Sequence, residues 1–278
     1  MHNKNQHIKS IIGGTIGNLV EWYDWFAYAV FSIYFAPAFF PSDNPTMQLL
    51  NTAGIFAIGS LMRPIGGWIL GSYADKFGRK KTLTFSVFLM CTGSFIIAVV
   101  PTYNSIGVIA PILLLFARMI QGLSVGGEDG TVAAYLSEIA PAKKRGFYCS
   151  FQSVTVTIGQ IIALSLLILL QTVFLTTEQL EQWGWRIPFV IGALLAVVAF
   201  YLRSNLEEST IFTEQKNKNT AHRGRVTILL QHRKAMWNMQ RCILNILDTK
   251  MDFFGILPFV FLFHCWGVFG CRIRKRRR

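Results

Sequence analysis

The apolar residues of this chain fall into six long runs that short polar or turn-like segments separate. The runs cover residues 11–40, 49–73, 83–100, 106–136, 147–175 and 187–201. A helix needs roughly 20 predominantly apolar residues to cross a hydrocarbon layer about 30 Å thick. The pattern therefore predicts an all-α membrane protein in which six helices cross the bilayer.

The composition agrees with this class and limits the choice of partners. Hydrophobic residues make up 52% of the chain and charged residues only 15%, where soluble domains carry roughly a quarter. The net charge of +13 is uneven: residues 1–221 hold 15 Lys and Arg against 12 Asp and Glu, whereas residues 222–278 hold 12 against 2. Because the basic surplus is confined to the tail, we expect no nucleic-acid partner.

Basic residues in the short connections predict the orientation in the membrane. They cluster before the first run, after the second, after the fourth and at the end of the sixth: Lys4, Lys9, Lys76, Arg79, Lys80, Lys81, Lys143, Lys144, Arg145 and Arg203. The alternate connections hold almost none. Cytoplasmic connections of membrane proteins are enriched in Lys and Arg. We therefore expect a cytoplasmic N-terminus and a multi-pass protein whose surroundings are the lipid bilayer.

Ionisable residues inside the predicted spans are the first candidates for function. The first span carries Glu21 and Asp24, the second Arg63, and the fourth Arg118 and Glu128. A charge at mid-membrane costs a few kcal/mol even on insertion scales, so such residues are rare unless they have a role. At 1.5 Å per residue, Arg63 lies roughly 18 Å from the cytoplasmic end of its helix, close to the midplane.

Two of these spans carry matching polar stripes. In the first and the fourth span, polar residues recur at steps of three, three and four, which places each set on one face of its helix. The sets are Asn18, Glu21, Asp24 and Tyr28, and Arg118, Gln121, Ser124 and Glu128. Two interpretations stay open: a cavity lining that binds substrate or protons, or a structural pairing, such as Arg118 with a carboxylate, that only satisfies buried charge.

The remaining residue types indicate packing and not catalysis. Small residues let membrane helices approach closely, with flexibility as the alternative interpretation, and the second and fourth spans contain Gly59, Gly66, Gly67, Gly71, Gly122, Gly126 and Gly127. The five cysteines have no paired spacing, and the histidines lie near the ends of the chain. Without a nucleophile–base set or a metal-ligand cluster, we expect no enzyme, no metal and no cofactor.

Several motifs resemble those of the major facilitator superfamily. The sequence GSYADKFGRKK at residues 71–81 resembles the signature loop between the second and third helices, and RMIQG at residues 118–122 is similar to a motif of the fourth. The segments GNLVEWYDWFAY, AAYLSEIAPAKKRGFYCSFQ and EQWGWRIPFVIGALLA look like the metabolite:proton symporters within that superfamily. The resemblance covers roughly residues 10–215.

The resemblance implies a fold of twelve helices in two six-helix halves, of which this chain holds the N-terminal half, in a bacterial inner membrane. It implies proton-coupled symport of a small organic acid, such as alpha-ketoglutarate, by alternating access. The implied contacts for acid and proton are Arg63, Arg118, Gln121, Glu21, Asp24 and Glu128. The signature loop would act as a cytoplasmic gate, with the motif residues Gly71, Asp75, Gly78, Arg79 and Lys80.

The chain departs from the family pattern in two places. Asp129 stands where these symporters usually carry an aromatic residue, and it adds an acid beside Glu128. After about Trp237 the likeness ends, and the rest holds an apolar run near residues 253–270 followed by a basic terminus. We therefore expect three parts: a six-helix bundle, a cytoplasmic central loop and an atypical basic tail, at residues 1–203, 204–237 and 238–278.

Three hypotheses follow for the whole chain. The first is a proton-coupled symporter. The second is an inactive truncated remnant, whose tail is the product of a frameshift or premature termination. The third is a half-size protein that works as a homodimer or as an interaction module. The substrate, an organic acid or an osmolyte, and the carboxylate that carries the proton stay open at this point.

Overall fold

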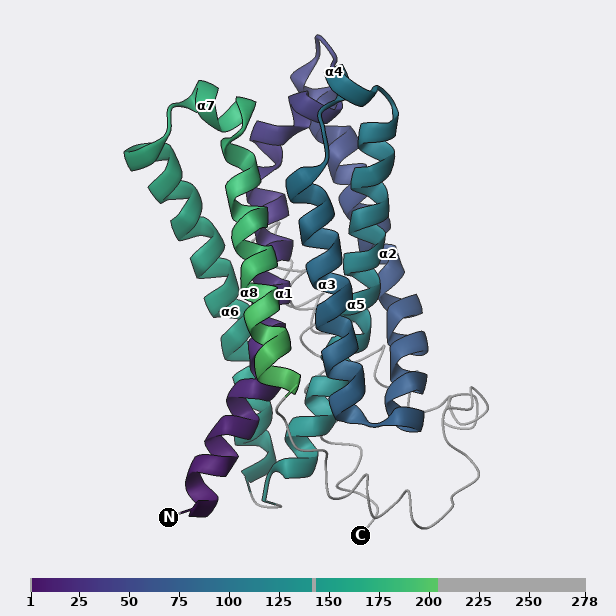
Figure 1. Cartoon of the computed structure of the whole chain (residues 1–278), viewed down its shortest axis with the longest axis vertical. Coiled ribbons are helices and arrows are strands. Elements are labelled where there is room, and N and C mark those ends of the chain that lie inside the picture. The colour runs from purple at the N-terminus through teal and green to yellow at the C-terminus, as the bar shows by residue number, and fades with distance from the viewer. Residues whose placement is uncertain (1, 142–143, 205–278) are drawn as a thin grey trace, which may run out of the picture.

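A computed structural model describes residues 2–141 and 144–204, with side chains described from Ile11 onward. Long helices dominate it: α1 (His2–Phe39), α2 (Pro45–Phe77), α3 (Arg79–Val99), α5 (Ile109–Ile139), α6 (Arg145–Leu169) and α8 (Ile187–Ser204). Short helical turns join them: α4 (Tyr103–Ile106), η2 (Leu170–Phe174), α7 (Thr177–Gln182) and η3 (Gly184–Arg186). The long helices run side by side (Figure 1). The expected central loop and basic tail lie, apart from Ser204, outside the described residues.

The six predicted runs correspond to the six long helices of the described part. Five of these are long and apolar enough to cross a membrane: α2, α3, α5, α6 extended by η2, and η3 with α8. Helix α1 is 38 residues long but is not among the five. Its middle carries Asn18, Glu21 and Asp24, which lower its hydropathy. The predicted all-α architecture is therefore confirmed for the described residues.

The ends of the helices follow from local chemistry. Asn44 caps α2 by accepting a hydrogen bond from the Thr46 amide at 2.9 Å, and Pro45 occupies the first helical position, where no backbone donor is needed. Gly78 alone separates α2 from α3, with φ at 110°, a conformation that L side chains rarely adopt. The fourth predicted run starts at Ile109 and not at residue 106, because Gly107 turns the chain with φ at 59°.

Helix α5 is central to one side of the bundle, where it packs against α2 and α3, while α1 packs mainly against α6 and α8. Glycines allow the contact between α2 and α5 to be close. A Cβ atom on Gly66 would overlap the backbone of Leu123, and one on Gly122 would overlap the Gly59 carbonyl. The packing interpretation is confirmed at these positions. At Gly71, by contrast, no atom of the described residues lies within 4 Å of an added Cβ, so the packing interpretation has no support there.

The two ends of the bundle differ in character. We name one the basic end, where Figure 1 places the junction of α2 with α3, the start of α6 and the end of α8, because Lys76, Lys80, Lys81, Lys144 and Arg145 lie there. Toward the opposite end, buried aromatic side chains fill the space around α1 and α8: Tyr23, Tyr28, Phe31, Phe35, Phe39, Trp185 and Phe189. The polar stripe of α1 runs from this aromatic core toward the basic end.

Candidate functional site

The two polar stripes predicted from the sequence face each other inside the bundle. Every ionisable or amide side chain of both stripes has no exposed surface: Asn18, Glu21 and Asp24 of α1, and Arg118, Gln121 and Glu128 of α5. Ser124 is equally buried, and Tyr28 is 1% exposed. The structure therefore brings together residues about 100 positions apart in the chain.

Gln121 links the cation of α5 to the acid of α1. The Arg118 guanidinium donates from Nη1 to the Gln121 side-chain oxygen, and the Gln121 amide donates to one carboxylate oxygen of Asp24. The same amide also donates to the Ser94 hydroxyl of α3 at 3.1 Å. Arg118 and Asp24 are thus coupled through an amide, which is one form of the structural pairing that the sequence left open.

Arg118 keeps unused hydrogen-bonding capacity. Its Nε and Nη2 atoms, and the second carboxylate oxygen of Asp24, have no hydrogen-bond partner within the part of the chain that the structure describes. The guanidinium carbon lies 4.1 Å from the ring centroid of Tyr28 and 4.3 Å from that of Trp25. Ring faces stabilise a cation without filling its donors. A buried guanidinium with free donors is suited to bind a carboxylate in two-point fashion.

Arg63 reaches the same aromatic ring from α2. Its guanidinium carbon lies 3.9 Å from the ring centroid of Trp25, and its exposed fraction is 4%. Asp129 and Glu21 attract this cation electrostatically, whereas Arg118 repels it. Asp129, the acid that departs from the family pattern, accepts a hydrogen bond from Gln152 of α6 at 3.3 Å. The guanidinium groups of Arg63 and Arg118 therefore both contact the ring of Trp25. The spacing of polar residues in the sequence had not identified Trp25 as part of the site.

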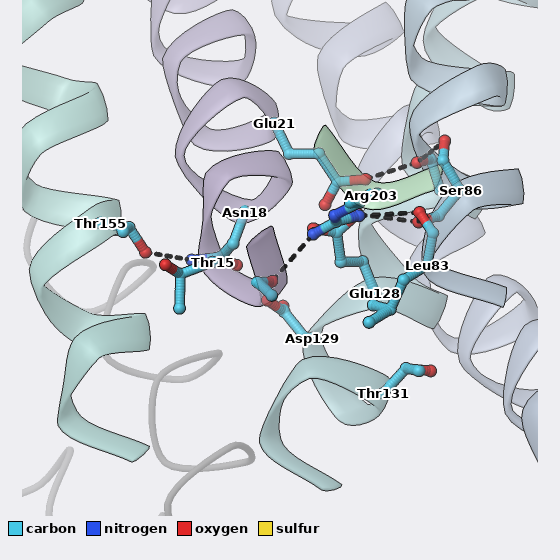
Figure 2. A network of polar contacts seen from close by, with 12 residues as sticks. Thr15, Asn18, Glu21, Leu83, Ser86, Glu128, Asp129, Thr131, Thr155 and Arg203 are labelled. Carbon is cyan, nitrogen blue, oxygen red and sulfur yellow. Dashed lines mark hydrogen bonds and ion pairs between the residues drawn. The ribbon is translucent and has the colours of Figure 1, made fainter. Parts of the chain in front are cut away.

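Glu128 belongs to a separate cluster, nearer the basic end. Arg203, in the last turn of α8, donates from Nη1 and Nη2 to the two carboxylate oxygens of Glu128, and both side chains are fully buried. Ser86 of α3 donates to the same carboxylate at 2.8 Å. Figure 2 shows Arg203 enclosed between Glu128 and the chain around Leu83. Glu128 therefore has the geometry of a structural ion pair, which was the alternative to a proton-binding role.

The sequence had indicated Arg203 only as a loop charge. In the structure, Arg203 connects several helices. Its Nε donates to the Gly13 carbonyl at 3.3 Å, and its Nη2 donates to the Gly14 carbonyl at 3.0 Å. Its Nη1 donates to the Leu83 carbonyl at 2.8 Å. An arginine at the end of an apolar helix is ordinarily a signal for the membrane surface. Nothing in the sequence distinguishes that case from a buried one.

Glu21 lies between the two clusters. The Ser124 hydroxyl is within hydrogen-bond distance of one Glu21 carboxylate oxygen, and it lies 2.7 Å from the Ser86 carbonyl. The other carboxylate oxygen of Glu21 has no partner among the described residues. Glu21 is also close enough to Glu128 for repulsion between the two acids.

The signature loop residues join three helices at the basic end. Arg79 donates to Asp75 at 2.7 Å, across the single-residue junction between α2 and α3. The same guanidinium lies 3.6 Å from a carboxylate oxygen of Glu138 near the end of α5. Asp75 and Arg79 are thus brought together, whereas Gly71 lies about one turn away in α2. No group of three potential metal ligands occurs within the described residues.

Comparisons with known proteins add a family context to this geometry. The protein-family model described as "Sugar (and other) transporter" matches residues 11–235. An alpha-ketoglutarate permease of Escherichia coli (strain K12) is 49% identical over 242 residues, which are 87% of this chain and 54% of that protein. A citrate-proton symporter of Klebsiella pneumoniae is 40% identical over 210 residues, 76% of this chain and 47% of that protein.

Solved structures with a similar fold were also found. The xylose transporter XylE from Escherichia coli, in a partially occluded inward-open conformation, matches with a TM-score of 0.68 at 21% identity. The match covers 76% of this chain and 52% of that one. A likeness at this identity shows the fold alone, which is the N-terminal part of a major facilitator protein. The chain spans about half the length of the curated relatives it matches.

Proposed function

Because this chain belongs to the sugar (and other) transporter family of the major facilitator superfamily, we propose that it carries a small organic acid together with a proton across the bacterial inner membrane. Alpha-ketoglutarate is the acid we test first, since a permease for it is 49% identical. The second similar protein is named for citrate and protons. Both names support a carboxylate as the recognised group.

The observation that carries this proposal is the state of Arg118. Burying a guanidinium with two nitrogens that lack hydrogen-bond partners destabilises the protein, unless a ligand binds these nitrogens at another stage of the transport cycle. A carboxylate of the substrate would fill both nitrogens with charge-assisted hydrogen bonds. The rings of Trp25 and Tyr28 hold the guanidinium in place meanwhile. Arg63, which shares the Trp25 ring, is the second cation for a diacid.

Proton coupling follows from competition for the same cation. Asp24 attracts Arg118 electrostatically and holds it through Gln121. An anionic substrate on Arg118 competes with ionised Asp24 for that positive charge. Protonation of Asp24 removes the competition, so substrate and proton bind together more favourably than either alone. Asp24 is therefore our choice for the proton carrier, ahead of Glu128, whose charge Arg203 already neutralises.

Uptake by the purified 278-residue chain in liposomes tests the proposal. We expect labelled alpha-ketoglutarate to accumulate when the outside is acidified and to leak out when a protonophore is added. Arg118→Lys should reduce uptake about 10- to 100-fold, because one charge-assisted hydrogen bond contributes roughly 1.5–3 kcal/mol. Arg186→Lys, which makes the same exchange at the far end of α8, is the matched control and should transport normally.

Asp24→Asn separates proton coupling from substrate binding. We expect this variant to lose proton-driven accumulation but to keep the exchange of labelled for unlabelled substrate, because the amide can still accept from Gln121. Asp43→Asn, in the exposed loop before α2, is its control. Citrate, proline and betaine complete the substrate panel. Absence of uptake for every compound, or equal uptake by Arg118→Lys and Arg186→Lys, would overturn the proposal.

A further inference from the structure

An open groove of about 430 Å³ lies at the basic end, away from the polar stripes. Helices α2, α3 and α8 form it. Its lining includes two lysines, a threonine and three phenylalanines: Lys80, Lys81, Thr84, Phe85, Phe88 and Phe200. No acidic residue is among the residues that line it. The groove therefore combines positive charge with an aromatic wall, and the transport cycle proposed above uses neither.

The two kinds of residue are sorted by depth along α3. Lys81, Thr84, Phe85 and Phe88 follow each other at steps of three, one and three, which places them on one face of the helix. Lys81 is near the start of α3, and Phe88 lies about 10 Å further along its axis. Phe85 and Phe88 have exposed fractions of 42% and 55%. The cations thus mark the level of the membrane surface, and the rings mark the level of the acyl chains.

The start of α3 concentrates basic residues. Its first turn contains Arg79, Lys80 and Lys81 and no acidic residue, although a helix N-terminus itself carries partial positive charge. Arg79 is paired with Asp75 and Glu138. No ion pair joins Lys81 to an acid within residues 11–141 and 144–204. An anion in the groove would lie beside Lys81 and next to the partial positive charge of the helix N-terminus.

We propose that this groove binds an anionic phospholipid, with the headgroup phosphate at Lys80 and Lys81 and the acyl chains against Phe85, Phe88 and Phe200. A soluble anion would contact only the lysines. A phospholipid would contact the lysines with its headgroup and the phenylalanine rings with its acyl chains. Thr84, whose hydroxyl donates to the Lys80 carbonyl at 2.9 Å, can still accept a hydrogen bond from the headgroup. The positive-inside distribution predicts that the lipid belongs to the cytoplasmic leaflet.

Native mass spectrometry of the full chain in detergent, titrated with phosphatidylglycerol, tests this site. We expect one phosphatidylglycerol to stay bound under conditions that remove phosphatidylcholine. The double variant Lys80→Gln/Lys81→Gln should bind it about 25-fold more weakly, since each lysine near an anionic headgroup contributes about a fivefold gain. The control Lys76→Gln/Lys144→Gln removes two exposed cations from the same end but outside the groove, and it should bind lipid normally.

A second variant distinguishes a built groove from general surface charge. Thr84→Trp keeps both lysines but fills the space between them and the phenylalanines, so it should also lose the retained lipid. Circular dichroism verifies that each variant keeps its helices. Equal lipid retention by the groove variants and the control pair overturns the proposal. So does displacement of the lipid by millimolar glycerol 3-phosphate, which would indicate a site for a soluble anion.

Discussion

Arg203 uses every N–H donor of its guanidinium on groups from three other helices. The acceptors are two carbonyls of α1, one carbonyl of α3 and the Glu128 carboxylate of α5. Because Arg203 itself belongs to α8, one side chain joins four helices at the basic end. A buried charge with complete hydrogen bonding is tolerated, but removing its partner leaves an uncompensated charge. Arg203 should therefore matter more for stability than any exposed basic residue around it.

Replacing Arg203 with methionine tests this expectation. The variant keeps most of the side-chain volume but leaves the Glu128 carboxylate buried without its cation. We expect the free energy of unfolding to fall by roughly 3–5 kcal/mol, measured as thermal or denaturant unfolding in detergent. Arg186→Met is the matched control, since Arg186 is only half-buried and donates a single recorded hydrogen bond, to the Val100 carbonyl at 3.0 Å.

A double-mutant cycle then isolates the pair. Arg203→Met combined with Glu128→Gln removes both charges, so its destabilisation should be clearly smaller than the sum of the two single effects. Additive effects would contradict an ion pair between these residues and would return Glu128 to the list of proton carriers. The same proteins can be assayed for uptake, where a purely structural pair predicts reduced amounts of folded protein but unchanged transport per folded molecule.

At the residue scale, periodicity was sufficient for most of the candidate site. Steps of three and four placed Asp24 on one stripe of its helix and Gln121 and Arg118 on a stripe of another, because a helix places such positions on one side whatever its neighbours are. It could not predict that Gln121 would stand between the acid and the cation, since that depends on how α1 and α5 are offset along their axes. Trp25 was missed for a related reason: an aromatic residue in an apolar helix gives no signal of a cation beside it.

At the scale of helices, the contact between α2 and α5 depends on the absence of side chains. A Cβ atom on Gly126 would overlap the carbonyl of Arg63, in the same way as one on Gly122 would overlap that of Gly59. These backbone contacts fix the position of Arg63 relative to Arg118 along the helix axes. Small residues at such positions let helices associate closely where no hydrophobic force drives them together.

Gly122→Ala should separate the two helices. Its new methyl group would meet backbone atoms that cannot rotate away, so we expect a loss of about 1–3 kcal/mol in the free energy of unfolding. Gly54→Ala makes the same chemical change in α2, where nothing lies within 4 Å, and should stabilise the helix slightly. The two unfolding temperatures in detergent are the measurement, and a Gly122→Ala protein as stable as Gly54→Ala contradicts the close contact.

The limits of the helices were less predictable than their existence. The apolar runs predicted all six long helices, and five of these are long and apolar enough to cross a membrane. The pattern began the fourth run at Ile106, the last residue of α4, because Ile106 and Val108 are apolar on either side of the turn at Gly107. It also could not foresee the π-helical turn η2 at the end of α6, because Leu170–Phe174 has the same composition as the helix before it.

At the scale of the molecule, the described helices form the N-terminal six-helix half of a major facilitator fold, as the motifs predicted. The motifs sufficed for this because they occur at fixed places in the order of helices. The distribution of basic residues adds a prediction that the fold alone does not make, namely which end of the bundle faces the cytoplasm. The expected boundaries at residues 203 and 237 and the tail after them stay predictions.

Labelling of single cysteines in intact cells decides the orientation. In a chain whose five native cysteines are replaced, Ser42→Cys and Glu178→Cys place an exposed thiol at the end opposite the basic one, whereas Lys76→Cys places one at the basic end. Because short cytoplasmic connections retain Lys and Arg, we expect a membrane-impermeant maleimide to label the first two directly and the third only after permeabilisation. The reverse pattern would put the N-terminus outside, and it would move the lysine-lined groove to the outer leaflet.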